Sequence, residues 1–362
     1  MEIIKKQISM NVCHGIEEYF PGKNILYFDI ETTGLSSSRG MIYLIGTAWR
    51  KEDSCYEIHQ YFAYNAIDEK DLILEFVRNI QSFDILVSFN GDNFDLPFLK
   101  KRAEYLGLSV NILNYGIVSV DIYRKIRKYC GLLGMENAKQ KTVEKFLGIQ
   151  RKDTVSGKEL IKVYRDYLVK RDEHMRDILL LHNSEDVTGL PVLSGMISYC
   201  GIFEGNWEIS GMETVENGIL IVCTLKNKIQ KALELQNSFV RVWILGEQVR
   251  ILLYTVTMEL KFFYPDYKNY YYLPKEDMAV HKSVAAFVDK EYRIKAAKEN
   301  CYMKRSGEFV KNYGLTSLHI LKRNYSENEE YVEAGELITM DIQTKEFREY
   351  VIKLLNSFIK RV

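Results

Sequence analysis

The stretch NILYFDIETTGL, residues 24–35, places two acidic side chains in what otherwise reads as a buried strand. Its apolar and β-favouring residues predict a strand that ends at the Thr-Thr-Gly turn. Side chains alternate between the faces of a strand, so Asp29 and Glu31 point one way while Phe28 and Ile30 point the other. Two carboxylates about 7 Å apart along one face repel each other unless a positive charge lies between them, and a divalent metal ion is the usual solution. The alternative interpretation is a pair of solvated acids at the end of a strand.

The length and composition favour a globular protein of two domains. A chain of 362 residues suits two domains that each bury a core, and 47% hydrophobic with 27% charged residues argues against extensive disorder. Acids and bases balance at 49 each, but residues 100–171 contain 17 Lys and Arg against 7 Asp and Glu. Positive charge beside an acidic motif suits a site that binds phosphate, although solvated helix faces also carry lysine.

The cysteines and the N-terminal segment indicate the compartment. The six cysteines are scattered without C-x-x-C spacing, which argues against a disulfide framework or a zinc site. The N-terminal MEIIKKQISM lacks an apolar signal core, and no apolar run approaches the roughly 20 residues of a membrane span. We therefore expect a protein of the reducing cytoplasm without a membrane partner.

The first half of the chain has an α/β pattern. Three consecutive β-like runs predict an antiparallel meander, and a fourth predicted strand follows among predicted helices. The predicted strands are residues 24–30, 39–50, 55–64 and 84–89. The predicted helices are residues 68–80, 94–107, 120–130, 141–148, 156–170 and 172–198. This order predicts a mixed β-sheet flanked by helices.

The second half is rich in strands and aromatic residues. Its predicted strands are residues 218–225, 238–246, 248–264 and 269–274, with a hairpin turn at Gly246. Helices are predicted at residues 277–290 and 345–362. The expected organisation is an N-terminal extension (1–23), an α/β domain (24–198) and a smaller β-rich α+β domain of unknown function (206–362).

Two further acidic signals follow the first. Asp95, in NGDNFDLPFL, opens a predicted helix directly after a predicted strand, where an N-terminal helix cap is the alternative interpretation. In HNSEDVTGL, His182 and Asp186 are four residues apart on a predicted helix, a spacing that stacks both on one face. A lone histidine on such a helix is more often structural than catalytic, but this one shares its face with an acid.

Together, FDIETTGL, NGDNFDLPFL and HNSEDVTGL resemble, in order, the three motifs of the DEDD superfamily of 3′–5′ exonucleases. The chain is most similar to the YprB-type RNase H-like domain of that superfamily, and KTVEKFLGIQRKDTVSGKELIKVYRDYL resembles its connecting segment. The resemblance covers about residues 24–190. It implies an RNase H-like fold and an exonuclease that acts on the single-stranded 3′ end of a nucleic acid.

The resemblance also implies the roles of the site residues. Asp29, Glu31, Asp95 and Asp186 become the ligands of two divalent ions, Mg or Mn, with Asp29 shared by both. His182 would take the proton from the attacking water, and the product would be a nucleoside 5′-monophosphate.

The third motif departs from the pattern of the superfamily. In the superfamily this motif usually has either a tyrosine with three residues between it and the aspartate or a histidine with four residues between. Here three residues separate His182 from Asp186, so this chain combines the histidine with the tyrosine spacing. Two roles therefore stay open for His182, the base itself or a group that orients the water.

Other residues carry weaker signals. Thr32, Asn90 and Phe94 are candidates for substrate binding, although Asn90 and Phe94 could simply build the turn into the helix. Asp121 is expected to cap a helix rather than to touch the site. The basic run RKIRK, residues 124–128, could grip a nucleic-acid backbone or form a solvated face.

The aromatic stretch KFFYPDYKNYYY, residues 261–272, has two interpretations. Interleaved lysine and aromatic side chains suit the stacking of single-stranded bases. Aromatic side chains also suit strand cores and cross-strand pairs, which is the favoured interpretation.

Three functions are compatible with these signals. The main hypothesis is a metal-dependent 3′–5′ exonuclease. The alternatives are an RNase H-like endonuclease and a non-catalytic nucleic-acid-binding module. No motif reports on the 2′-hydroxyl that distinguishes RNA from DNA or on the oligomeric state.

Overall fold

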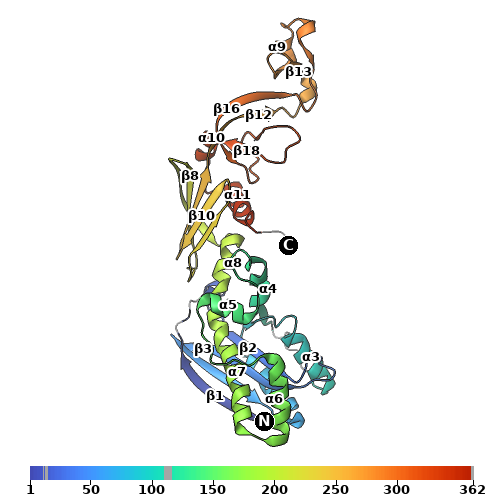
Figure 1. The fold of residues 1–362 in the computed structure, drawn as a ribbon, viewed down its shortest axis with the longest axis vertical. Coiled ribbons are helices and arrows are strands. Elements are labelled where there is room, and N and C mark those ends of the chain that lie inside the picture. The colour runs from blue at the N-terminus through green and yellow to red at the C-terminus, as the bar shows by residue number, and fades with distance from the viewer. Residues whose placement is uncertain (11, 13–14, 110–115, 360–362) are drawn as a thin grey trace. The chain divides into compact units, whose positions relative to one another are not determined.

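The strand that carries the first two acids, β2 (Ile25–Thr32), lies inside a six-stranded sheet of order β1-β4-β3-β2-β5-β6 (Figure 1). It pairs antiparallel with β3 (Ile42–Glu52) and parallel with β5 (Ile85–Ser88). Since β3 pairs antiparallel with β4 (Cys55–Phe62), the predicted meander is confirmed. The mixed sheet with helices on its faces confirms the predicted α/β class.

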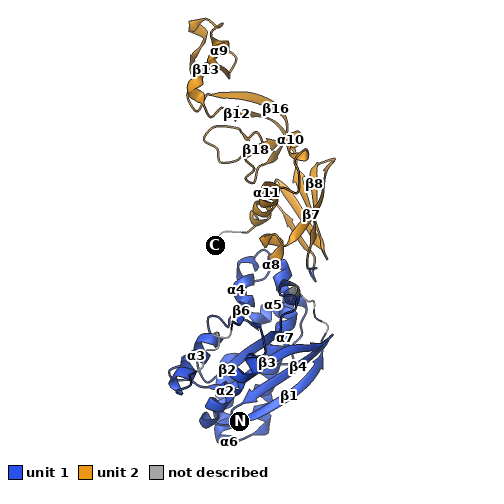
Figure 2. Cartoon of the chain, turned by 180° about the vertical axis from the view of Figure 1, so that it is seen from behind, with its two compact units in different colours: residues 1–200, 227–231 blue, residues 201–226, 232–362 orange. Residues whose placement is uncertain are grey.

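The structure is a computed structural model that describes residues 1–10, 12, 15–109 and 116–359. The chain divides into two units (Figure 2). Unit 1 comprises Met1–Cys200 and Asn227–Lys231, and unit 2 comprises Gly201–Lys226 and Ala232–Val362.

Two helices cover opposite faces of the six-stranded sheet. The ring of Phe28 meets that of Phe76, on α2 (Glu69–Ile80), at 5.6 Å, whereas the neighbouring Asp29 meets Asn183, on α7 (Glu173–Leu193). The predicted alternation of apolar and acidic side chains along β2 is therefore confirmed. The other helices of the first 204 residues are α1 (Gly15–Tyr19), α3 (Asp95–Tyr105), α4 (Ile122–Ile126), α5 (Gln140–Leu147), α6 (Gly157–Lys170) and α8 (Met196–Glu204), with the 3-10 turns η1 (Ala66–Asp68) and η2 (Arg127–Tyr129).

A glycine allows α7 to lie close to the sheet. Gly46 is an isolated glycine inside β3, and a Cβ atom there would lie 2.3 Å from Oδ1 of Asn183 and 2.5 Å from Cγ2 of Val187. Isolated glycines in strands often mark such a close approach. The absent side chain lets α7 pack directly against β2 and β3, which brings its polar residues to Asp29 and Glu31.

Unit 1 differs from the expectation at two places. The segment set apart as an extension contributes β1 (Glu2–Ser9), which pairs with β4 along its length as an edge strand. Most of its side chains are exposed, so it lacks a strong apolar pattern. The start of the helix expected at residues 120–130 is wrong, because β6 (Val118–Asp121) precedes α4 and lies parallel to β5. A four-residue strand is too short to show a period.

The described residues of unit 2 form three β-structures, which confirms its β-rich character. A five-stranded antiparallel sheet has the order β7-β8-β11-β10-β9, and β12, β16, β18 and β17 close a small barrel. A three-stranded sheet has the order β14-β13-β15. The strands are β7 (Trp207–Val215), β8 (Gly218–Leu225), β9 (Leu233–Gln236), β10 (Val240–Leu245), β11 (Gln248–Tyr254), β12 (Val256–Phe263), β13 (Tyr270–Leu273), β14 (Met278–His281), β15 (Ile294–Lys295), β16 (Tyr302–Lys311), β17 (Leu321–Lys322) and β18 (Tyr331–Glu333).

The local predictions for unit 2 have mixed outcomes. The hairpin is confirmed, since β10 pairs with β11 and Gly246 in the turn has a φ of 59°. The helix expected at residues 277–290 is wrong, because this segment forms β14 and the four-residue α9 (Lys282–Ala285). The remaining helical elements are η3 (Tyr267–Asn269), η4 (Lys290–Tyr292), α10 (Ala334–Ile338) and α11 (Lys345–Asn356), the last close to the predicted terminal helix.

The aromatic side chains of the stretch 261–272 are half-buried. None of its aromatic side chains is fully buried, and Tyr264 stacks on Tyr270 with ring centroids 4.4 Å apart. Tyr270 also meets its cross-strand partner His281 at 5.4 Å. Cross-strand pairing is thus present, and Phe262 packs against the buried residues of the barrel, as the favoured interpretation expected.

One helical run passes a length and hydropathy test for a membrane span. Within the described residues, Glu173–Glu204 contains a window of mean hydropathy 1.2, contrary to the expectation that no apolar run is long enough. However, 83% of that window is buried inside the structure. A central helix of a folded unit has this character.

Candidate metal centre and active site

The two acids of β2 face α7, and Asp95 approaches them from another element. Asp95 is the first residue of α3, which follows β5 and its connecting loop. The N-cap position of α3 is occupied by Phe94, and Oδ1 of Asp95 accepts the N–H of Ile30 at 3.3 Å. The helix-cap interpretation of Asp95 is therefore not what the structure contains. The carboxylate lies against β2 between Asp29 and Glu31.

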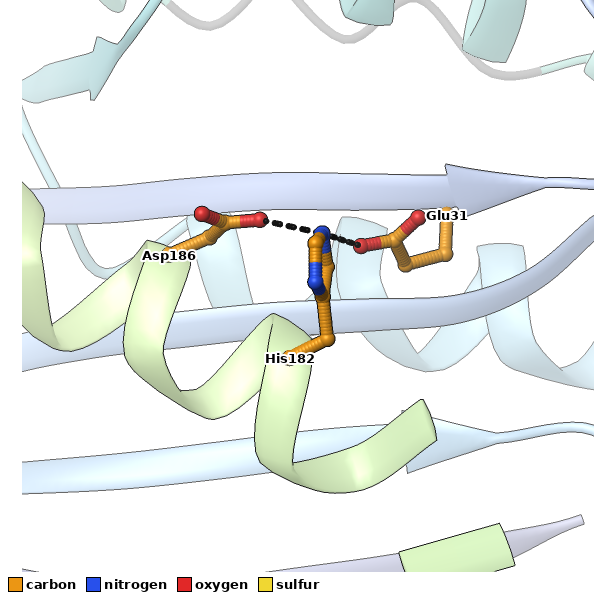
Figure 3. Close-up of side chains that lie close together, drawn as sticks. All are labelled: Glu31, His182 and Asp186. Atoms are coloured by element: carbon orange, nitrogen blue, oxygen red, sulfur yellow. Dashed lines mark ion pairs between the residues drawn. The ribbon is translucent and has the colours of Figure 1, made fainter. Parts of the chain in front are cut away.

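His182 lies between two of the candidate ligands (Figure 3). Its Nε2 is 3.1 Å from Oδ2 of Asp186 and 3.7 Å from Oε1 of Glu31. The predicted shared helix face of His182 and Asp186 is confirmed. One ligand atom from each of these three residues lies within 4.8 Å of the others, a spacing that could hold a metal ion.

Burial and mutual repulsion keep these acids from ionising easily. Burial and the neighbouring carboxylates raise the pKa of Asp29 well above its ordinary value. Burial raises the pKa of Glu31 to about 8, although the charge of His182 opposes the rise. Burial likewise raises the pKa of Asp95 to about 7, against the hydrogen bond from Ile30. Clustered acids of this kind gain from a bound cation.

Two cations already partly offset this negative charge. Burial lowers the pKa of His182, but the hydrogen bond and charge of Asp186, helped by Glu31 and Asp153, raise it to about 9. Arg151 forms an ion pair with Asp186. Burial raises the pKa of Asp186, yet His182 and Arg151 together hold it below its ordinary value.

Sequence reasoning missed the residues that hold His182 and Asp186. Nδ1 of His182 lies 2.7 Å from Oδ2 of Asp153, which is buried and also accepts the N–H of Val155 at 2.9 Å. Arg151 bridges Asp186 and the buried Glu144. Arg151 and Asp153 belong to the connecting segment that resembles its counterpart in the YprB-type domain. That resemblance was the available signal, but it named no residue.

A second missed group positions Asp29. Nδ2 of Asn183, which is fully buried, donates to Oδ2 of Asp29 at 3.2 Å. Nε2 of Gln60 in turn donates to Oδ1 of Asn183 at 3.1 Å and to the Leu180 carbonyl at 2.8 Å. Asn183 is adjacent to His182 in the third motif, and a buried amide on a core helix was the signal that could have found it.

The candidate substrate-binding residues lie around the same strand ends. The hydroxyl of Thr32 donates to the carbonyl of Gly34 at 2.9 Å and closes the turn after β2. Asn90 has a positive φ of 67°. Phe94 is half-buried and its ring lies 5.5 Å from that of Phe98. All three have structural contacts of their own, and a role in substrate binding stays a prediction.

Asp121 caps α4, as predicted. Its carboxylate accepts the N–H of Arg124 at 3.2 Å. It also accepts the N–H groups of Asn90 at 2.8 Å and Asp92 at 3.3 Å. The cap therefore fixes the loop that leads to Asp95 as well as the start of α4.

Comparison with known proteins gives one family match. Residues 26–197 match the family model of the RNase H superfamily. This region contains all four candidate ligands and His182, and the match supports a nuclease-type function for unit 1. The narrower YprB-type assignment stays a prediction.

DNA polymerases are among the similar curated proteins, each matched over a short region. The chain is 40% identical to the DNA polymerase of Methanocaldococcus jannaschii over 45 residues, 12% of this chain and 3% of that protein. It is 50% identical to DNA polymerase 1 of Aeropyrum pernix over 40 residues, 11% of this chain and 4% of that protein. With the DNA polymerase of Pyrococcus glycovorans it shares 35% identity over 101 residues, 24% of this chain and 12% of that protein. The chain thus spans at most 12% of the length of these three relatives.

A solved structure also aligns with most of the chain. The family B DNA polymerase from Pyrobaculum calidifontis matches 93% of this chain and 47% of its own, with 12% sequence identity and a TM-score of 0.45.

Proposed function

We propose that this protein is a metal-dependent 3′–5′ exonuclease of the DEDD class, which hydrolyses phosphodiester bonds at the single-stranded 3′ end of a nucleic acid and releases nucleoside 5′-monophosphates. The observation that carries the proposal is the convergence of buried and half-buried carboxylates from β2, α3 and α7 beside one imidazole. The superfamily match of residues 26–197 supports it.

The donor set fits two hard divalent cations, Mg or Mn. All four proposed ligands are carboxylates, which these ions prefer. The pKa values of Asp29, Glu31 and Asp95 are raised, which shows that the buried cluster has too little positive charge to keep its acids ionised. Asp29, Glu31, Asp95 and Asp186 would hold the ions. When bound, such ions stabilise the negative charge that develops on the phosphate and make water a better nucleophile.

His182 is the proposed proton acceptor, and Asp153 orients it. The contact of Nδ1 with Asp153 keeps a proton on that nitrogen, so Nε2 is the atom that faces Glu31 and Asp186. With a pKa of about 9, His182 is protonated at neutral pH while it is the cation between these carboxylates. It loses that proton more easily once other positive charge neutralises the same carboxylates, and Nε2 then becomes a base.

Arg151 and Asn183 hold the carboxylates of Asp186 and Asp29 in place. Arg151 fixes Asp186 through an ion pair that Glu144 supports, and Asn183 fixes Asp29 through a hydrogen bond. Neither needs to touch the substrate to act. Both keep a carboxylate in one orientation, which is the usual role of residues behind a metal ligand.

The test is cleavage of 5′-labelled single-stranded DNA and RNA with Mg²⁺, Mn²⁺ or EDTA. We expect a ladder that shortens from the 3′ end, nucleoside 5′-monophosphates as products, and no reaction in EDTA. A matched oligonucleotide with a blocked 3′ end should resist. Cleavage of the blocked oligonucleotide would instead identify an endonuclease, and binding without cleavage would identify a non-catalytic module.

A pair of variants on α7 provides the control. Asp186→Asn removes a proposed ligand and should abolish cleavage. Asp177→Asn changes an exposed acid on the same helix and should cleave at the wild-type rate. Equal activity of both variants would contradict the proposed site.

A further inference from the structure

The basic run after β6 is not compensated by acids of its own segment. Residues 124–128 contain four cations, all exposed, and residues 122–135 contain no Asp or Glu. Arg124 and Lys125 lie on α4, and Arg127 and Lys128 lie on the 3-10 turn η2 that follows it. The run therefore presents four positive side chains on two short consecutive turns.

The sheet topology brings this run to the edge that holds the site. β2, β5 and β6 are parallel, so their carboxyl ends lie at the same edge. Asp29 and Glu31 are near that end of β2, and α4 begins directly after β6 ends at Asp121. With β5 between β2 and β6, the start of α4 lies two strand spacings, about 10 Å, to the side of the acids.

Asp121 ties the basic run to the site. The same carboxylate binds the N–H of Arg124, in the first turn of α4, and the N–H of Asn90, in the loop that leads to Asp95. The position of α4 relative to Asp95 is thus set by hydrogen bonds to one buried side chain. Cations on α4 are held at a defined distance from the proposed reaction centre.

Two cations of the run are available to a ligand. Arg124 pairs with Asp92 at 2.7 Å. In contrast, Lys125 and Arg127 make no ion pair with any residue that the structure describes, and both side chains are exposed. Beside them, Tyr123 of α4 meets Phe89 at 6.0 Å, and both rings are half-buried. Cations next to partly exposed rings match the backbone and the bases of a single strand.

We propose that Lys125 and Arg127 bind backbone phosphates of a single-stranded nucleic acid on the 5′ side of the phosphate that is cleaved. The inference rests on the proposed function, because the polyanion is identified as the substrate of the adjacent carboxylate site. It places the path of the substrate strand along α4, next to the end of β6. Of the two interpretations of residues 124–128, it selects contact with a nucleic-acid backbone over a solvated face.

Equilibrium binding in EDTA tests the surface without cleavage. Fluorescence anisotropy of a labelled single-stranded oligonucleotide, recorded from 50 to 300 mM KCl, gives affinity and salt dependence. Each lost phosphate contact should lower the slope of log K against log salt by about 0.7 for a single strand. Lys125→Gln with Arg127→Gln, named the α4 double variant although Arg127 lies just after α4, should therefore lower the slope by about 1.4 and weaken binding roughly tenfold or more at low salt.

A matched variant controls for net charge. Lys70→Gln with Arg78→Gln removes the same amount of charge from α2, which covers the face of the sheet opposite to α7. It should keep the wild-type slope. If the α4 double variant also keeps the wild-type affinity and slope, the proposal is wrong, and the same holds if both double variants lose equally. The charge reversal Arg127→Glu repeats the test at one position.

Cleavage separates this inference from the proposed function. With Mn²⁺, the α4 double variant should raise KM on a long single strand and leave kcat nearly unchanged, because the carboxylates are intact. If the wild-type chain binds with the expected slope but cleaves nothing, the proposed exonuclease fails while the binding surface stands. If it cleaves and the α4 variant has an unchanged KM, only the binding surface is refuted.

Discussion

Glu31 should destabilise unit 1 at alkaline pH when no metal is present. Its pKa rises from 4.5 to about 8 in the folded protein, mainly because it is buried. Between these values the folded state holds a proton that the unfolded state has lost, so stability falls as pH rises through this range. Glu31→Gln keeps the shape of the side chain and removes the titration. The variant should therefore be the more stable protein above pH 8 in EDTA.

The size of the effect follows from the shift. A difference of about 3.5 units at 1.36 kcal/mol per unit sets an upper bound of about 5 kcal/mol. The variant also loses the contact of Glu31 with His182, 3.7 Å away, which offsets part of this gain. We expect a net gain of about 2–3 kcal/mol at pH 8.5, which raises the melting temperature by roughly 5–10 °C for a unit of this size.

The assay is thermal unfolding of both proteins in EDTA at pH 5 and pH 8.5. The curves should nearly coincide at pH 5 and separate at pH 8.5. Glu69→Gln is the control, because it should change stability in the opposite direction. The buried Glu69 binds Arg102 at 2.8 and 2.5 Å, so its loss should destabilise the protein by about 3–5 kcal/mol. Mg²⁺ should then stabilise the wild type more than Glu31→Gln. A variant that melts below the wild type at pH 8.5 would show that Glu31 is a satisfied structural residue.

Substitutions at three further positions test the site, with Asp177 as a control position. His182→Ala should lower the cleavage rate about 10²–10⁴-fold and remove the imidazole limb of the pH–rate profile, whereas His182→Tyr, at the spacing where the superfamily carries tyrosine, should regain part of the rate. Asp153→Ala removes the contact to Nδ1 and should lower the pKa of His182, measured by NMR titration in EDTA, while Asp177→Ala should not. Gly46→Ala should cost about 1–3 kcal/mol in denaturant unfolding, because its Cβ would lie 2.3 Å from Oδ1 of Asn183.

Each of these has an outcome that contradicts it. Wild-type cleavage and an unchanged pH profile in His182→Ala would make the imidazole a bystander. An unchanged pKa of His182 in Asp153→Ala would remove the orienting role of that carboxylate. Wild-type stability of Gly46→Ala would mean that α7 can move away from β3 without loss.

Regular elements with a clear period were predictable, and short or exposed ones were not. The meander, α2, α3, α6 and α7 follow from apolar periodicity over many residues. β1 and β6 were missed because one is exposed along an edge and the other has four residues. The helix expected at residues 277–290 was wrong because intrinsic preference is weak against the pairing of β14 with β13.

The local geometry of the site follows from short sequence patterns. Strand alternation puts Asp29 and Glu31 on one face, and helical spacing puts His182 and Asp186 on another, because both periods are properties of a few residues of backbone. Tertiary structure alone decided that these faces meet, since the approach of α7 depends on Gly46 and on the packing of the core. It also decided that Arg151 and Asp153 reach Asp186 and His182, because contacts between segments about 30 residues apart are set by packing and not by any local period.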